Sequence, residues 1–158
     1  MTPITVPLTE AEKQAYIYSK TAAKFIFHRQ DILNVQVWAN GAVWVRFSKG
    51  SRLCSKSAFK FYFAESRRQR ANGLLITANP YDKTRFTARS QRDPNKIYNL
   101  TAHPDRIVCN CPDHEMQCLI GIGRATCKHA YALLNHLGCD SLQSYIEKTV
   151  YSVVEIGF

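Results

Sequence analysis

The strongest constraint on how this chain folds is a group of cysteines and a histidine between residues 107 and 138. Cys109 and Cys111 are separated by one residue, and Cys127 and His129, which follow after fifteen residues, are also separated by one. Thiolate sulfur and imidazole nitrogen are the ligands that Zn²⁺ prefers in closed tetrahedral sites. The spacing therefore predicts a single structural zinc ion held by these four side chains.

The two halves of the pattern require different local structures. On an extended strand, Cys109 and Cys111 leave the same face, and a turn at Pro112 can bring both to one ion. On a helix the same spacing rotates side chains by about 200°, so Cys127 should precede a helix that has His129 in its first turn. The unpaired N–H groups of that helix start favour a thiolate. We expect a strand, a turn, a long loop and a helix, with four protein ligands and no open metal position for catalysis.

Two alternatives to this ligand set remain open in the sequence. His114 and Cys118 lie in the expected long loop, and either can replace a member of the set. The six cysteines can instead form disulfides, but the N-terminus has no export signal, and in a reducing compartment such clusters more often bind metal. No run of 18 apolar residues occurs, so we expect a soluble cytoplasmic or nuclear protein without a membrane partner.

The segments Cys109-Asn-Cys111-Pro-Asp and Cys127-Lys-His129-Ala resemble the SWIM zinc finger, a family defined by Cys-x-Cys followed by Cys-x-His. The strand-like segment 97–100 before Cys109 also resembles the β-β-α module of that family. The resemblance covers residues 85–137, about a third of the chain, and does not include the first 80 residues. It implies a finger that binds DNA or other proteins and is not itself an enzyme.

Hydrophobic periodicity predicts an α+β protein with helices packed on a small antiparallel sheet. The resemblance implies that this protein includes a C-terminal β-β-α zinc finger. Thr9 and Glu12 have the spacing of a capping box, and Asn40-Gly41 is a strong hairpin signal. Helices are predicted from Thr9 to about Arg29, from Ser55 or Ser57 to Ala71, from Lys128 to Leu137, and from Ser141 to Lys148. Strands are predicted at 32–38, 42–47, 74–78, 85–90, 97–101 and 107–109.

No repeat or Pro-, Gly- or Ser-rich linker divides the 158 residues, a length typical of one domain. We expect one compact unit, or two tightly joined halves, made of three regions. Residues 1–80 form an N-terminal helix, hairpin and helix region of unknown role. Residues 81–140 form the SWIM-like finger module, and residues 141–158 form a C-terminal extension.

The net charge of +9 is concentrated in one part of the chain. Residues 49–106 contain 13 lysines and arginines and four acidic residues, a balance of +9, whereas the remaining residues balance to zero. Such a concentration is expected where a surface meets a polyanion, although a charge run is often only a solvated face. Interleaved aromatic residues would also allow base stacking. The candidate nucleic-acid contacts are Lys56, Lys60, Arg67, Arg68, Arg70, Arg85, Arg89, Arg92 and Lys96.

These features favour a structural-zinc accessory factor that binds nucleic acid, most simply DNA, through residues 49–106. The alternative is an adaptor that docks on a larger DNA- or RNA-processing complex without touching nucleic acid. An enzyme with a small-molecule substrate is not expected, because no Gly-rich phosphate loop, Ser-His-Asp order or paired carboxylates beside a histidine pair can be found. The partner's identity, the choice between DNA and RNA, and the oligomeric state are left open by the sequence.

Overall fold

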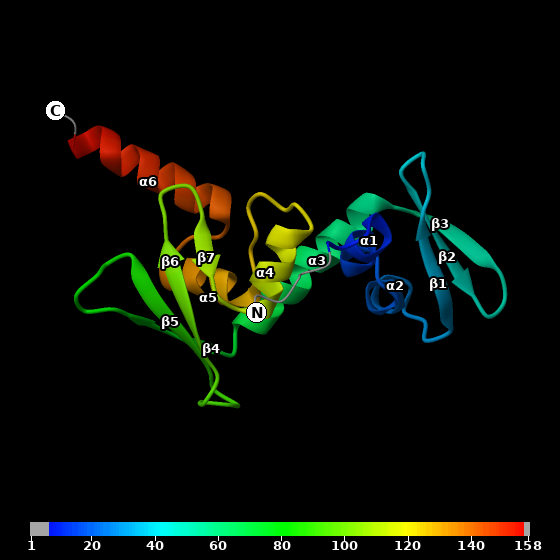
Figure 1. The fold of residues 1–158 in the computed structure, drawn as a ribbon, viewed down its shortest axis with the longest axis horizontal. Helices are drawn as coiled ribbons and strands as arrows, with labels where there is room; N and C mark the ends of the chain where they lie inside the picture. Colours follow the sequence, from blue (N-terminus) through cyan, green and yellow to red (C-terminus); the bar gives the residue numbers. More distant parts are fainter. Residues whose placement is uncertain (1–6, 157–158) are drawn as a thin grey trace. The chain divides into compact units, whose positions relative to one another are not determined.

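Figure 1 shows the fold as a computed structural model that describes residues 7–156, with side chains up to residue 152. The protein is α+β, as predicted, and its strands form a three-stranded and a four-stranded antiparallel sheet. The chain divides into two compact units, residues 1–66 and 67–158. The division by role into 1–80, 81–140 and 141–158 stays a prediction, and its outermost residues lie outside the described part. No helix in the described part is long and apolar enough to cross a membrane.

The first unit begins with helix α1 (Glu10–Ile17), and its start is the predicted capping box. The backbone N–H of Glu12 donates to the hydroxyl of Thr9 over 3.2 Å, and the backbone N–H of Thr9 donates to the carboxylate of Glu12 over 2.8 Å. Both bonds satisfy N–H groups that have no partner within the helix.

The prediction of one helix as far as Arg29 is wrong, because α1 ends at Ile17 and a second helix, α2 (Lys20–Phe27), follows. The break is at Ser19, whose hydroxyl accepts a hydrogen bond from the backbone N–H of Ala22 over 3.1 Å. A serine that caps a new helix competes with continuation of the old one. Apolar periodicity runs through both helices and hides this break.

Strands β1 (Ile32–Val37) and β2 (Ala42–Phe47) form the predicted hairpin, with Gly41 at a φ of 86° in the turn. A third strand, β3 (Ser51–Ser55), pairs with β2 and was not predicted. Its sequence is mostly polar and its residues are mostly exposed, so it carries little hydrophobic signal. Val43 and Val45 of β2 are fully buried together with Phe59 and form the centre of this unit's core.

Helix α3 (Lys56–Ala71) ends at the predicted residue and leads into the second sheet. The sheet is a meander of β4 (Leu74–Ala78), β5 (Arg85–Ser90), β6 (Ile97–Ala102) and β7 (Ile107–Cys109), and these positions confirm the prediction to within one residue. Helix α5 (Lys128–His136) packs across all four strands (Figure 1). Leu133 and Leu134 meet Phe86 and Leu100 of the sheet in the second core.

Two more helices complete the second unit. Helix α4 (Pro112–Leu119) lies in the segment expected to be a loop. Helix α6 (Leu142–Ile156) begins where a helix was predicted but runs eight residues beyond Lys148. The hydroxyl of Tyr145 donates to the carbonyl of His103 over 2.9 Å, which ties α6 to the turn between β6 and β7.

Helix α3 offers a matched test of the first core. Phe59 is fully buried and Phe61 is 69% exposed. Phe59→Ala should lower the free energy of unfolding by about 3–5 kcal/mol because it leaves a cavity. Phe61→Ala should change it by less than about 0.5 kcal/mol. Urea denaturation followed by tryptophan fluorescence measures this directly, since Trp38 and Trp44 both lie in the first unit. Equal losses would contradict the assignment of the core.

Candidate metal centre

The structure brings the four predicted ligands together. Cys109 is the last residue of β7, Cys111 and Cys127 immediately precede α4 and α5, and His129 is in the first turn of α5. All four are buried, and their ligand atoms lie within 4.8 Å of one another. The sulfurs of Cys109 and Cys127 are 3.7 and 3.8 Å from Nδ1 of His129. Zinc bonds of about 2.3 Å to sulfur and about 2.0 Å to nitrogen place tetrahedral ligand atoms about 3.6 Å apart. The cluster has the size that one zinc ion requires.

Two of the thiols are also helix caps. The sulfur of Cys111 accepts a hydrogen bond from the backbone N–H of His114, and the sulfur of Cys127 accepts one from Ala130, each over 3.4 Å. A serine or aspartate at the N-cap of a helix makes the same bond with its side-chain oxygen. The positive end of each helix dipole favours the ionised form of sulfur. Sequence reasoning predicted this arrangement for Cys127 and missed it for Cys111.

The missed feature is helix α4, because residues 112–126 were expected to form a long loop. Pro112 is the first residue of α4, and Asp113 and Glu115 are in its first turn. Proline at the first helical position followed by acidic residues is typical of a helix start, so the signal was present. The helix is only eight residues long, which leaves too little sequence for a clear apolar periodicity.

The alternative ligands lie outside the cluster. His114 and Cys118 both belong to α4, where Cys118 is exposed, and neither is in the four-residue group. His114 is buried, its Nδ1 has no hydrogen-bond partner among the described residues, and burial lowers the pKa of its imidazole. All six cysteines are free thiols, so the disulfide alternative is not realised.

Three sulfurs this close cannot all ionise without a cation. Hydrogen bonds from the thiols of Cys109 and Cys127 hold the pKa of Cys111 far below its usual value, and the bond to Cys111 raises the pKa of Cys109 far above it. For Cys127, the bond from Cys109 lowers the pKa, but the bond to Cys111 and burial outweigh it and raise the pKa to about 12. The three thiols therefore oppose one another's ionisation. A divalent cation removes this conflict, because coordination deprotonates each thiol.

Neighbouring side chains hold the ligands in place. The ring of Tyr98 on β6 lies against the imidazole of His129, with centroids 4.4 Å apart. Gln117 on α4 is buried and accepts a hydrogen bond at Oε1 from the backbone N–H of Thr126 over 2.9 Å. Its Nε2 donates to the carbonyl of Thr126 over 3.3 Å. Because Thr126 directly precedes Cys127, Gln117 fixes the approach of the chain to the second half of the cluster.

The same network uses one residue that was predicted to bind nucleic acid. Nε and Nη2 of Arg67 donate to Oδ2 and Oδ1 of Asp113 over 2.8 and 2.6 Å, and Nε2 of Gln117 donates to Oδ2 of Asp113 over 3.2 Å. The Arg67 residue is only 7% exposed. Its charge neutralises a carboxylate inside the second unit, so we remove Arg67 from the candidate nucleic-acid contacts. No local sequence signal separates it from Arg68 and Arg70.

The other candidate contacts lie mostly at the surface. Lys56 is half-buried and lies over the ring of Tyr18 at 5.9 Å. Arg85 pairs with Asp82 over 3.3 Å. The residues classed as exposed are Lys60, Arg68, Arg70, Arg85, Arg89, Arg92 and Lys96. Lys56 and Lys60 belong to the first unit and the others to the second.

The fold and the cluster define an α+β protein with a buried Cys₃His centre suited to one structural zinc ion. No family model matches the chain, and neither the search of curated proteins nor the search of solved structures gives a match. Further statements about function must come from the residues themselves.

A cysteine pair tests the metal centre. Wild-type protein should contain one zinc ion per chain, and Cys127→Ser should lose it, because an alcohol is a much weaker zinc ligand than a thiolate. Cys118→Ser, outside the cluster, should keep both metal and stability. Elemental analysis and urea denaturation measure the two effects. Metal-free wild-type protein with an intact second unit would contradict the assignment.

The supporting network makes a separate prediction. Gln117→Ala leaves the backbone N–H and carbonyl of Thr126 without their partner and should lower zinc affinity about tenfold or more. Glu115→Ala, an exposed change on the same helix, serves as the control. The rate of zinc transfer to a chromophoric chelator distinguishes them. Identical rates would mean that Gln117 does not position the ligands.

Proposed function

We propose that this protein is a nucleic-acid-binding accessory factor, most simply for DNA, with a SWIM-type zinc finger whose metal holds the second unit together. The ligand order supports the finger assignment, because Cys109 ends β7, His129 lies in α5, and Tyr98 of β6 packs against His129, so β6, β7 and α5 meet at the cluster. The cluster supplies four protein ligands, which supports a structural ion and a role without catalysis. Such a role belongs in the cytoplasm or nucleus.

The observation that carries this proposal is the outer face of the second sheet. On β5, Phe86 and Ala88 are buried in the core, whereas Arg85 and Arg89 are exposed and Thr87 is half-buried. Alternate residues of a strand point to opposite faces. Two arginines and a threonine therefore share the face that is turned away from the core.

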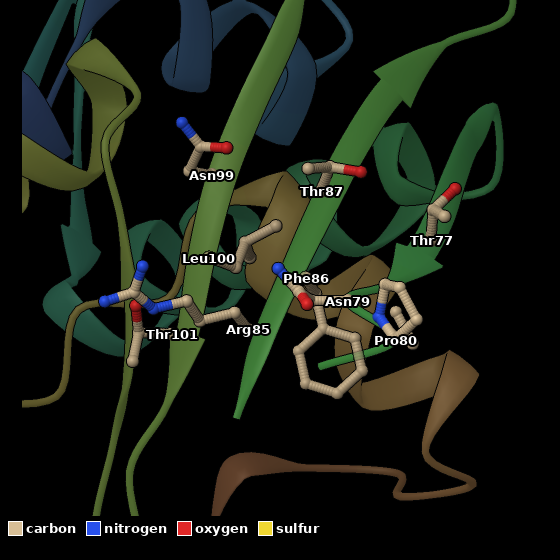
Figure 2. Close-up of a pocket in the computed structure, with 10 residues that line it drawn as sticks. Thr77, Asn79, Pro80, Arg85, Phe86, Thr87, Asn99, Leu100 and Thr101 are labelled. Atoms are coloured by element: carbon tan, nitrogen blue, oxygen red, sulfur yellow. The ribbon is translucent and has the colours of Figure 1, made fainter. Parts of the chain in front are cut away.

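This face contains a hollow of about 510 Å³. Figure 2 shows Thr77, Thr87 and Asn99 in a row across β4, β5 and β6, and the pairing register places them side by side. Arg85 lies opposite Thr101 at the same hollow. No carboxylate is among its lining residues. Hydroxyl, amide and guanidinium groups are the usual donors to phosphate and sugar oxygens.

A different observation favours the adaptor role. On the first sheet, the rings of Trp38 and Trp44 stack with centroids 6.3 Å apart, and Leu53 pairs with Trp44 across the strands. Trp38 is 40% and Leu53 is 59% exposed. Exposed apolar residues that lie together mark protein interaction sites. In this second candidate function, the first unit docks on a larger DNA- or RNA-processing complex.

Salt dependence tests nucleic-acid binding. Affinity for a short DNA duplex should fall steeply as salt rises, and Arg85→Gln with Arg89→Gln should reduce the slope of log K against log salt by about two. The control, Lys20→Gln with Arg46→Gln, removes the same charge from exposed positions of the first unit that lie outside residues 49–106. Fluorescence anisotropy measures both. No binding by the wild type at about 50 mM salt would contradict the proposal and favour the adaptor.

A further inference from the structure

A second cavity of about 510 Å³ in the second unit differs from the sheet hollow in its charge. It lies where the end of α3, the turn after β5 and the start of α5 meet. Three of its lining residues are cations and none is acidic. Its polar lining consists of Gln69, Arg70, Ser90, Gln91, Arg92 and Lys128.

The three cations come from segments far apart in the sequence. Arg70 is in the last turn of α3, Arg92 is in the turn between β5 and β6, and Lys128 is the first residue of α5. Among the described residues, no carboxylate forms an ion pair with Arg92 or Lys128. A hollow lined by one sign of charge concentrates the field and attracts counter-ions. Folding alone does not neutralise the charges of Arg92 and Lys128, whereas an anion would.

Hydrogen bonds shape the turn that carries Arg92. The hydroxyl oxygen of Ser90 accepts from the backbone N–H of Arg92 over 3.2 Å, and the backbone N–H of Gln91 donates to the carbonyl of Gly73 over 3.2 Å. The second bond fixes the turn against the junction between α3 and β4. The hydroxyl proton of Ser90 and the side-chain amide of Gln91 can then donate to a ligand in the cavity.

The ligand cluster fixes the backbone of the third cation, Lys128. Lys128 lies between Cys127 and His129, which are 0% and 4% exposed and belong to the ligand cluster. Its backbone position is therefore set on both sides by the ligands. A lysine whose backbone is fixed before a ligand arrives loses less freedom on binding than a lysine on a mobile segment.

We propose that this cavity is a phosphate-binding site formed by Arg70, Arg92 and Lys128. Guanidinium groups recognise phosphate with paired hydrogen bonds, and an ammonium group adds a point charge. The volume exceeds that of one phosphate, so a phosphate attached to a sugar also fits. A backbone phosphate of nucleic acid and a free phosphate or nucleotide share this chemistry, and only the first of these sources rests on the proposed function.

The test uses full-length, zinc-loaded protein and two probes. Inorganic phosphate is titrated at constant ionic strength against chloride and followed by amide NMR shifts, and a DNA duplex is titrated by anisotropy. Wild-type shifts should saturate at Ser90, Arg92 and Lys128, and Arg92→Gln with Lys128→Gln should weaken phosphate binding about tenfold or more. The control is Lys20→Gln with Arg46→Gln, and unchanged zinc content shows that the cavity variant is folded.

Each outcome decides the proposal. Loss of phosphate binding in the cavity variant supports the site, as does a loss of DNA affinity clearly larger than in the control. A phosphate effect without a DNA effect assigns the site to free phosphate or a nucleotide. If phosphate does not saturate and the cavity variant binds DNA like the control, the site is overturned, while wild-type DNA binding still upholds the proposed function. If the wild type does not bind DNA, the phosphate titration alone decides the site.

Discussion

The meeting of three sulfurs and one imidazole nitrogen within 4.8 Å is the constraint on which the second unit depends. It joins the end of β7 to the starts of α4 and α5, so one ion can connect a strand to two helices. The sulfurs oppose one another's ionisation until a cation is present, and each capping sulfur also satisfies a helix N–H group. Metal coordination and helix capping therefore use the same two atoms, Sγ of Cys111 and Sγ of Cys127.

Buried polar groups around the cluster extend this arrangement. Gln117 bonds to the backbone N–H and the carbonyl of Thr126, the residue before Cys127, and Asp113 connects Gln117 to Arg67. A buried guanidinium is tolerated only when a partner neutralises it, and the half-buried carboxylate of Asp113 supplies that charge to Arg67. Part of the basic character of the chain therefore serves the interior, and the number of cations overstates what a nucleic acid can reach.

The surfaces that remain differ between the two units. The second unit has two such surfaces. One is a sheet face with two arginines and a row of hydroxyl and amide groups, and the other is a cavity lined with three cations. In the first unit, the exposed side of the sheet presents stacked tryptophans and Leu53. The first kind of surface suits phosphates and the second suits an apolar partner. An accessory factor that contacts nucleic acid with one unit and a protein with the other would use both.

The sequence by itself determined the fold class, the hairpin at Asn40-Gly41, most strand positions and the composition of the zinc ligand set, because spacing and turn chemistry are local. It also contained the start of α4, in Pro112 and the acids after it, although the short helix hid that signal. Only the tertiary structure decided that Arg67 is internal, that Gln117 supports the cluster, and that Lys128 shares a cavity with Arg70 and Arg92. Those relations join residues distant in the chain, and a side chain's burial and partners depend on packing that local sequence does not encode.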